Sequence, residues 1–160
     1  MHISSLSEET GASMTRTIRE VLEKKGHQVH TIDVDATVMD AITVMNQHHI
    51  GSVVVCEAGA WVGIFTERDV LTRIVAPRRD PDTTRVRDVM TRELFTMTPD
   101  QPLSAAMEAM TQRRCRHVPI VAAGKLHGML SIGDVNKALH AHLASELHEL
   151  ESYISSPYVA

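Results

Sequence analysis

The stretch G-I-F-T-E-R-D at residues 63–69 returns later in the chain as G-M-L-S-I-G-D at residues 128–134. The offset between the two stretches is 65 residues, and without a gap it aligns residues 31–70 with residues 96–135. Eleven of these forty aligned positions are identical, which indicates an internal duplication. In the first copy they are Thr31, Asp35, Ala41, Met45, Gln47, Val53, Ala58, Gly59, Gly63, Asp69 and Val70.

Each copy is predicted to form a short strand, a helix, two strands and a second helix. In the first copy, apolar residues recur at helical spacing over residues 38–45, strands are predicted at 52–56 and 61–65, and the second helix begins at Glu67. In the second copy, helical spacing covers residues 103–110, and strands at 117–121 and 126–130 flank a turn. The predicted fold class is therefore α/β.

The repeats divide the chain into five predicted segments. A polar segment covers residues 1–16, the first repeat 17–76, a Pro- and charge-rich linker 77–85, the second repeat 86–142 and a helical tail 143–160. Upstream of the aligned block, residues 18–22 match residues 86–90 at an offset of 68, so the first repeat contains three extra residues. A repeat of roughly 60 residues buries little surface, so we expect the two to share a core, with a cleft between them.

Composition excludes several classes of protein. The chain has 160 residues, a net charge of −4 and a pI near 6.2, whereas nucleic-acid binders normally carry a clustered excess of Lys and Arg. It contains neither the apolar run of a membrane span nor that of a signal peptide, so we expect a cytoplasmic protein. Cys56 and Cys115 lack Cys-x-x-Cys spacing, which indicates reduced thiols.

The repeated unit, ending in Gly-apolar-x-Ser/Thr-x-x-Asp, resembles the cystathionine-β-synthase (CBS) repeat over about residues 17 to 142. Two in tandem resemble a stand-alone CBS pair, or Bateman module. The resemblance implies two β-α-β-β-α repeats packed through their sheets with pseudo-two-fold symmetry. It also implies a regulatory, signal-transducing module without catalytic activity or a required cofactor, whose cleft binds AMP, ADP, ATP, NAD or S-adenosylmethionine. Asp69 and Asp134 would then hold ribose, and Thr66 and Ser131 would face phosphate.

The chemistry of the motif agrees with these roles. Thr66 and Ser131 follow predicted strands and open predicted helices, where free N–H groups and the helix dipole attract a phosphate. Asp69 and Asp134 lie one turn later, and one carboxylate can accept hydrogen bonds from both vicinal hydroxyls of a ribose. The same spacing is also that of a capping box, so a purely structural helix cap is the alternative explanation.

Cationic partners for a phosphate are predicted in the second repeat, where a basic run covers residues 113–117. By the resemblance, Arg116 or His117 reaches the phosphate of the Asp69 site. By the same resemblance the Asp134 site has only Ser52, Lys25 or His27 nearby, so we expect two unequal half-sites, with the Asp69 site better supplied with positive charge. The full set of further cleft contacts that we expect is Ile64, Met129, Lys25, His27, Val29, Ser52, Val53 and Arg68.

Two other functions remain as alternatives. Ten histidines and two cysteines suggest a metal or redox sensor, although no recognisable zinc-ligand spacing joins them, and we predict no metal site. A nucleotide-hydrolysing enzyme is the other alternative. The sequence has no P-loop and no Gly-x-Ser-x-Gly elbow, and we predict no catalytic residues.

The tail carries an apolar stripe at helical spacing. Its members are Leu139, Leu143, Leu147, Leu150 and Ile154. Such a stripe must be covered, either by its own domain or by a second chain. We expect a homodimer to which this helix contributes, and any downstream target is a separate, unidentified protein.

Overall fold

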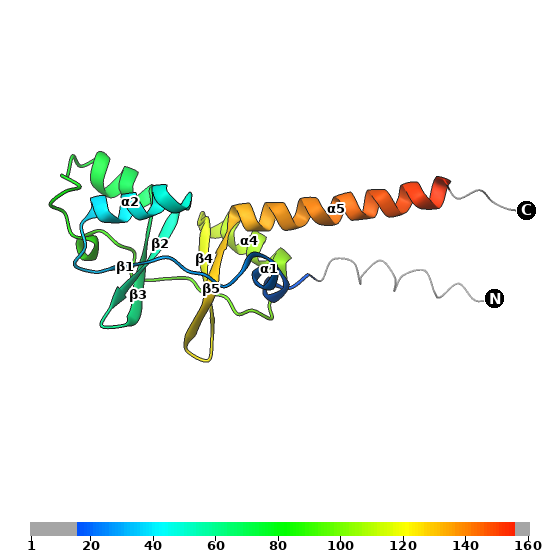
Figure 1. Ribbon diagram of the computed structural model, residues 1–160, viewed down its shortest axis with the longest axis horizontal. Helices are drawn as coiled ribbons and strands as arrows, with labels where there is room; N and C mark the ends of the chain where they lie inside the picture. Colours follow the sequence, from blue (N-terminus) through cyan, green and yellow to red (C-terminus); the bar gives the residue numbers. More distant parts are fainter. Residues whose placement is uncertain (1–15, 156–160) are drawn as a thin grey trace, which may run out of the picture. The chain divides into compact units, whose positions relative to one another are not determined.

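The computed structural model describes residues 16–155, so nearly all of the predicted polar segment 1–16 and the last five residues of the tail lie outside the described part. Within it, the predicted α/β fold class and the C-terminal helix are confirmed (Figure 1). The elements are α1 (Ile18–Lys25), β1 (Thr31–Asp33), α2 (Val38–His48), β2 (Ser52–Glu57), β3 (Ala60–Thr66), α3 (Glu67–Asp69), η2 (Val70–Val75), η3 (Val86–Asp88), α4 (Leu103–Arg113), β4 (His117–Ala122), β5 (Lys125–Ser131) and α5 (Ile132–Ser155).

Both predicted hairpins form, and their turns are alike. β2 and β3 pair antiparallel, and β4 lies beside β5 in a two-stranded sheet. Ala58 and Gly59 have φ of 49° and 80°, and Ala123 and Gly124 have φ of 49° and 73°. Two successive residues with positive φ give the two-residue turn whose twist matches that of the flanking strands, so the repeated Ala-Gly accounts for both turns.

The first helix of each repeat also forms where predicted. α2 and α4 each have 11 residues, and each ends in a left-handed cap, at His49 and Arg114 respectively. Thr37 begins α2 with a capping box, because its hydroxyl accepts a hydrogen bond from the N–H of Asp40 while the Asp40 carboxylate accepts one from the N–H of Thr37.

The short first strand predicted for the second repeat is wrong. β1 pairs parallel with β2, and the Val54 N–H donates to His30 O at 2.9 Å. The residue equivalent to Val54 is Pro119, which has no N–H to donate. Only an isolated bridge between Met97 and Ile120 remains, because proline interrupts the ladder.

The helix predicted from Glu67 forms, but it changes type after one turn. α3 covers Glu67–Asp69 and continues as the π-helix η2 over Val70–Val75. Arg73 of η2 donates from Nη1 to the carbonyl oxygens of Val89 and Met90, both at 2.7 Å. These bonds attach the wider helix to the segment that follows the linker.

The chain forms two compact units that do not coincide with the sequence repeats. One unit contains the described residues 16–25, Thr98–His117 and 130–155, and the other contains Gly26–Met97 and Val118–Met129. α1, which opens the first repeat, therefore belongs with α4 and α5 of the second. η3, the segment of the second repeat that is equivalent to α1, belongs with α2 of the first repeat.

Backbone hydrogen bonds also join the leading segment of each repeat to the other repeat. In one unit, Leu103 N donates to Arg16 O at 2.8 Å and Ile18 N donates to Gln101 O at 3.0 Å. In the other, the equivalent bonds are Val38 N to Thr84 O and Val86 N to Ala36 O, both 2.9 Å. Each leading segment thus completes the unit built mainly from the other repeat.

The predicted linker is folded onto its unit. The first N–H groups of a helix have no acceptor within the helix. At the start of α2, the N–H of Val38 donates to Thr84 O and the N–H of Met39 donates to Pro81 O. Asp80 holds a turn by accepting from the N–H of Asp82 at 2.9 Å. The linker therefore contributes to the helix start.

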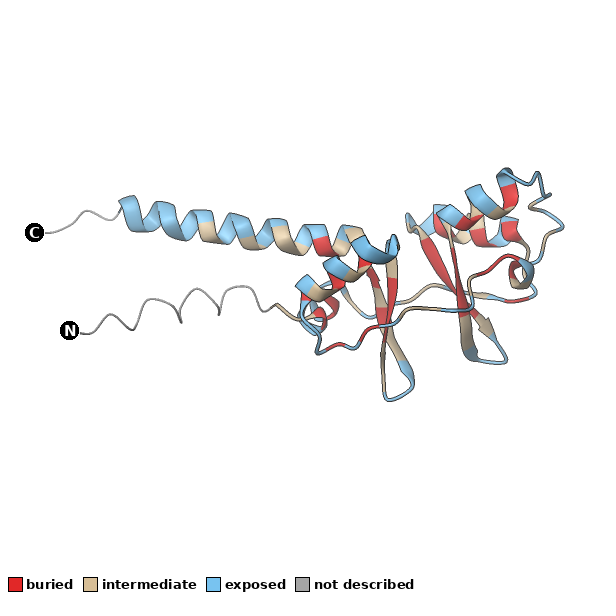
Figure 2. Ribbon diagram, turned by 180° about the vertical axis from the view of Figure 1, so that it is seen from behind, coloured by how far each residue is buried: buried red, intermediate tan, exposed pale blue. Residues whose placement is uncertain are grey.

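Each unit has an aliphatic core lined by its own elements (Figure 2). The core of the unit containing β1–β3 comprises Val34, Val38, Ala41, Met45, Val53, Val55, Phe65, Ile74, Val86, Val89 and Met90. In the other unit, the fully or nearly fully buried side chains include Ile18, Leu22, Leu103, Ala106, Met110 and Val135. α1 thus supplies core residues to the unit that it completes.

Candidate functional site

The first Ser/Thr-x-x-Asp copy lies where β3 ends and α3 begins. The N–H and Oγ1 of Thr66 donate to Asp69 Oδ2 at 2.9 and 3.0 Å, and the N–H of Asp69 donates back to Thr66 Oγ1 at 3.3 Å. This is a complete capping box, so the structural alternative is present in the molecule.

The second oxygen of Asp69 is also engaged. Asp69 Oδ1 lies 3.4 Å from Thr91 Oγ1 and 3.4 Å from the Nε of Arg73. Only 7% of Asp69 is exposed. A ligand hydroxyl at this carboxylate would therefore replace or share contacts that the unit already makes.

The second copy lies where β5 ends and α5 begins, and its carboxylate is held differently. The N–H of Ser131 and the Nζ of Lys25 both donate to Asp134 Oδ2, at 2.8 and 2.6 Å, and the N–H of Asp134 donates to Ser131 Oγ at 3.1 Å. Both of these bonds to the carboxylate are made to Oδ2. The capping geometry is present here too, but one carboxylate oxygen remains available as an acceptor.

Asp134 is ionised at neutral pH. Burial alone would raise the pKa of this carboxyl, but the hydrogen bond from Lys25, the hydrogen bonds from Ser131 and the Lys25 charge together hold it below its ordinary value. A carboxylate that accepts hydrogen bonds in its charged form is suited to binding the hydroxyl groups of a sugar.

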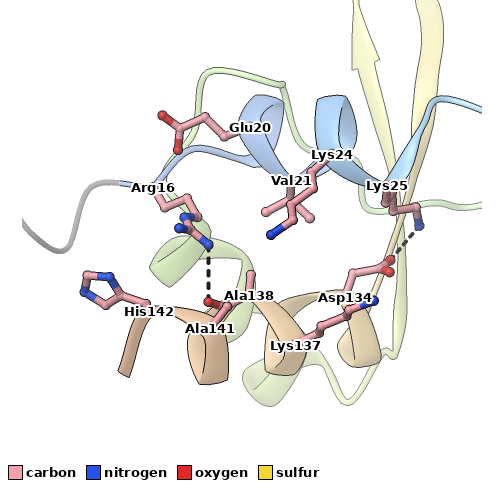
Figure 3. A pocket seen from close by; sticks show the side chains of 10 residues that line it. All are labelled: Arg16, Glu20, Val21, Lys24, Lys25, Asp134, Lys137, Ala138, Ala141 and His142. Carbon is pink, nitrogen blue, oxygen red and sulfur yellow. Dashed lines mark hydrogen bonds and ion pairs between the residues drawn. The ribbon is translucent and has the colours of Figure 1, made fainter. Parts of the chain in front are cut away.

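A cavity of about 690 Å³ opens beside Asp134, within the same unit (Figure 3). One lining residue lies two positions before α1, and the others belong to α1 or to one face of α5. They are Arg16, Glu20, Val21, Lys24, Lys25, Asp134, Lys137, Ala138, Ala141 and His142. Figure 3 shows Arg16 and Lys24 directed from the α1 side towards α5. Besides Lys25, which we expected near Asp134, the cations Arg16, Lys24 and Lys137 line the same cavity.

Arg116 and His117 belong to the unit that contains Asp134. The carbonyl oxygen of Arg116 accepts the N–H of Ile132, the first residue of α5, at 2.8 Å, and His117 begins β4. Their predicted role at the Asp69 phosphate stays a prediction.

The other predicted contacts differ in exposure. Ile64, Ser52 and Val53 are buried, Val29 and Met129 are half-buried, and Lys25 and Arg68 are exposed. The Nδ1 of His27 lies 2.8 Å from the carbonyl oxygen of His127, and Lys25 is bonded to Asp134. Of the eight, Lys25 alone lines the cavity beside Asp134.

Sequence reasoning missed three cavity residues, Arg16, Lys24 and Lys137. Lys137 lies three positions after Asp134 on the same helix, a spacing that places two side chains side by side and was visible in the sequence. No sequence pattern links Arg16 and Lys24 to Asp134, because only the structure shows that the segment around α1 folds with α4 and α5.

Features of a metal or redox site are few. Among residues 16–155, no three His, Cys, Asp or Glu side chains are grouped as metal ligands. Burial, and then the charge of Asp33, raises the pKa of the Cys56 thiol above its ordinary value, which lowers its thiolate fraction.

No helix in the described part is long and apolar enough to cross a membrane.

The model of the CBS domain matches residues 15–76 and 86–141. The chain belongs to the CBS-domain family. It is 39% identical to the mitochondrial CBS domain-containing protein CBSX3 of Arabidopsis thaliana, over 94% of this chain and 77% of that protein.

Solved CBS-domain structures have the same fold. A CBS-domain protein of Burkholderia ambifaria, provisionally assigned to signal transduction, matches with a TM-score of 0.76 and 34% identity over 79% of this chain and 95% of that one. A hexameric CBS-CP12 protein from bloom-forming cyanobacteria matches with a TM-score of 0.67 and 26% identity over 76% and 71%. The CBS family thus includes proteins that self-associate.

Proposed function

We propose that this CBS-domain chain binds an adenosine nucleotide and acts as a regulatory module that catalyses no reaction itself. The observation that carries the proposal is the Asp134 carboxylate, which is ionised, oriented by Ser131 and Lys25 through one oxygen, and available through the other. The candidate ligands are AMP, ADP, ATP, NAD and S-adenosylmethionine. Occupancy would regulate by stabilising one arrangement of the chain or its partner over another.

The two half-sites are proposed to be unequal, with Asp134 the tighter ribose site. Asp69 is 7% exposed and already uses both oxygens, whereas Asp134 keeps one oxygen available beside a cavity lined by cations. Thr66 and Ser131 remain the proposed phosphate-facing residues, since each lies at a helix start. Arg116 and His117 remain candidates for the phosphate at Asp69.

The support for binding rather than catalysis comes from the hydroxyl groups of the motif. Thr66 Oγ1 and Ser131 Oγ are each paired with the Asp of their own capping box. These hydroxyls thus serve the helix caps, whereas an activated nucleophile is hydrogen-bonded to a general base. We propose a cytoplasmic location because Cys56 and Cys115 are free cysteines, which are typical of a reducing compartment.

A thermal-shift experiment tests the proposed function. Each candidate ligand at millimolar concentration should raise the melting temperature of the chain if it binds, since a ligand at about 100 times its Kd stabilises by about 2.7 kcal/mol. Asp134→Ala should abolish the shift. The control is Asp100→Ala, an exposed carboxylate of the same unit, which should keep it. No shift with any of the five ligands would contradict the proposal.

We also propose that the chain forms a homodimer through the second half of α5. Leu143, Leu147, Leu150 and Ile154 are 55%, 61%, 59% and 81% exposed, and Figure 2 shows this half of the helix as almost wholly exposed. Their steps of 4, 3 and 4 residues are those of the a and d positions of a coiled coil, which bury apolar side chains against a matching helix. A second copy supplies such a helix.

The charges beside this stripe favour an antiparallel pair. In a parallel coiled coil, heptad positions g and e would bring Glu146 beside Glu151 of a second copy, and like charges repel. Antiparallel pairing instead places Glu146 beside Tyr153, whose hydroxyl can donate to a carboxylate. The paired stripes then bury eight Leu and Ile side chains without facing glutamates.

Sedimentation over a concentration series tests the dimer. Leu147→Lys should raise the dissociation constant at least tenfold, because it places a charge at the centre of the stripe. The control is Ser145→Lys, on the opposite face, which should leave it unchanged. A wild-type chain that stays monomeric at high micromolar concentration, or a dimer indifferent to Leu147→Lys, would overturn the proposal.

A further inference from the structure

We propose that the groove between α1 and α5 receives the phosphate chain of the bound nucleotide, so that the Asp134 site prefers a di- or triphosphate to AMP. This inference rests on the proposed function, because it takes Asp134 as the ribose ligand. It adds the chemical class of the ligand, which the ribose contact alone does not distinguish.

The groove begins at the proposed ribose site and extends along α5. Residues 134, 137, 138, 141 and 142 of α5 line it, and this spacing places them on one face of the helix. From Asp134 to His142 the helix rises about 12 Å, at 1.5 Å per residue. Ala138 and Ala141 lie in the middle, where their small side chains leave the space that forms the cavity.

Positive charge is concentrated in this groove, although the whole chain has a net charge of −4. Its lining carries four cationic side chains, Arg16, Lys24, Lys25 and Lys137, against the carboxylates of Glu20 and Asp134. Glu20 accepts the N–H of Thr17 at 3.1 Å, in the cap of α1, and Asp134 is paired with Lys25. The cations therefore exceed the carboxylates that neutralise them.

Three of the cations have no carboxylate partner within residues 16–155. In the described part of the chain, Lys24 and Lys137 form no ion pair, and Arg16 donates from Nη1 to the carbonyl oxygen of Ala138, at 3.4 Å. Gathering like charges costs free energy unless an anion lies between them. A chain of phosphate groups supplies several negative charges at the spacing of such a groove.

The helix dipole does not account for all of these charges. Lys24 and Lys25 lie in the last turn of α1, where cations stabilise a helix. Lys137, however, lies in the second turn of α5, far from the C-terminal end where the dipole favours a cation, and Arg16 precedes α1. An anionic ligand explains why Lys137 and Arg16 line the same space as Lys24.

Calorimetric titrations of the full chain test the proposal, with adenosine, AMP, ADP, ATP and inorganic tripolyphosphate at one ionic strength. ATP should bind at least tenfold more tightly than AMP. Lys137→Gln and Lys24→Gln should each weaken ATP about three- to tenfold and AMP less than twofold. The control is Lys125→Gln, at the exposed start of β5, which should change neither affinity.

The outcomes separate this inference from the proposed function. Equal affinities for AMP and ATP, with no effect of the two lysine variants, would overturn the groove as a phosphate site and leave nucleotide binding intact. If no adenosine compound binds but tripolyphosphate does, and Lys137→Gln weakens it, the proposed function fails and the groove stands as a polyphosphate site. If neither class binds, both fail.

Discussion

Gly63 lies where a side chain has no room. It is in β3, next to Ile64, whose N–H donates to Thr91 O at 3.0 Å and whose carbonyl accepts the N–H of Thr91 at 2.9 Å. A Cβ added at Gly63 would lie 2.6 Å from Thr91 O and 3.2 Å from Met90 Sδ. The nearest atom is backbone and is fixed by these two hydrogen bonds, so it moves only if the bridge opens.

The size of the effect of Gly63→Ala follows from this contact. Ordinary contact begins near 3.4 Å, so the backbone must part by about 0.8 Å, and overpacking of this kind costs about 1–3 kcal/mol. Replacing glycine within a strand recovers roughly 0.5–1 kcal/mol of chain entropy. The net loss of about 1–2 kcal/mol should lower the melting temperature by about 2–8 °C in a chain of this size.

A melting curve followed by circular dichroism measures this, with Gly133→Ala as the matched control. Gly133 lies in the first turn of α5, and an added Cβ would meet only Ser131 Oγ, at 3.6 Å. That substitution should stabilise by about 0.5–1 kcal/mol, because alanine favours the helix. If Gly63→Ala melts at or above the wild-type temperature, the close approach of β3 to residue 91 is refuted.

Three further substitutions test other contacts. The pKa of Asp134 is lower in the folded than in the unfolded state, so its stabilising contribution is present above about pH 4 and is lost as the pH falls through the folded pKa. Between pH 6 and about pH 3, the free energy of unfolding measured in urea should therefore fall less for Asp134→Asn than for wild type. An equal fall in both proteins would count against the Lys25–Asp134 pair. Arg73→Met removes two hydrogen bonds to backbone carbonyls and should cost about 1–3 kcal/mol in the same assay, whereas no change would show that these bonds contribute nothing. Thr37→Ala breaks the capping box of α2 and should cost about 1 kcal/mol, and an unchanged midpoint in urea would contradict the cap.

The hairpins and first helices were predictable because their signals are local. The Ala-Gly turns at residues 58–59 and 123–124 and the capping residue Thr37 act on their immediate neighbours. Proline is also a local signal, and Pro119 in the expected strand pairing would have shown that the second repeat lacks its first strand. The π-helix after Asp69 depends on contacts of Arg73 with distant residues, which the local pattern does not report.

The candidate site was predictable only in part for the same reason. The duplicated motif identified Ser131 and Asp134, and the spacing of the motif already contained the capping-box alternative that both copies show. The groove cations Arg16 and Lys24 lie just before and within the start of the first repeat, yet both fold with the second. A sequence offset shows that segments are equivalent but not that they are exchanged.

The central claim is that an adenosine nucleotide binds at Asp134. The most direct measurement is a calorimetric titration of wild type, Asp134→Ala and Asp69→Ala with ATP, giving affinity and stoichiometry together. We predict that Asp134→Ala abolishes the tighter binding event, whereas Asp69→Ala retains it. Unchanged ATP affinity and stoichiometry in Asp134→Ala would contradict the account.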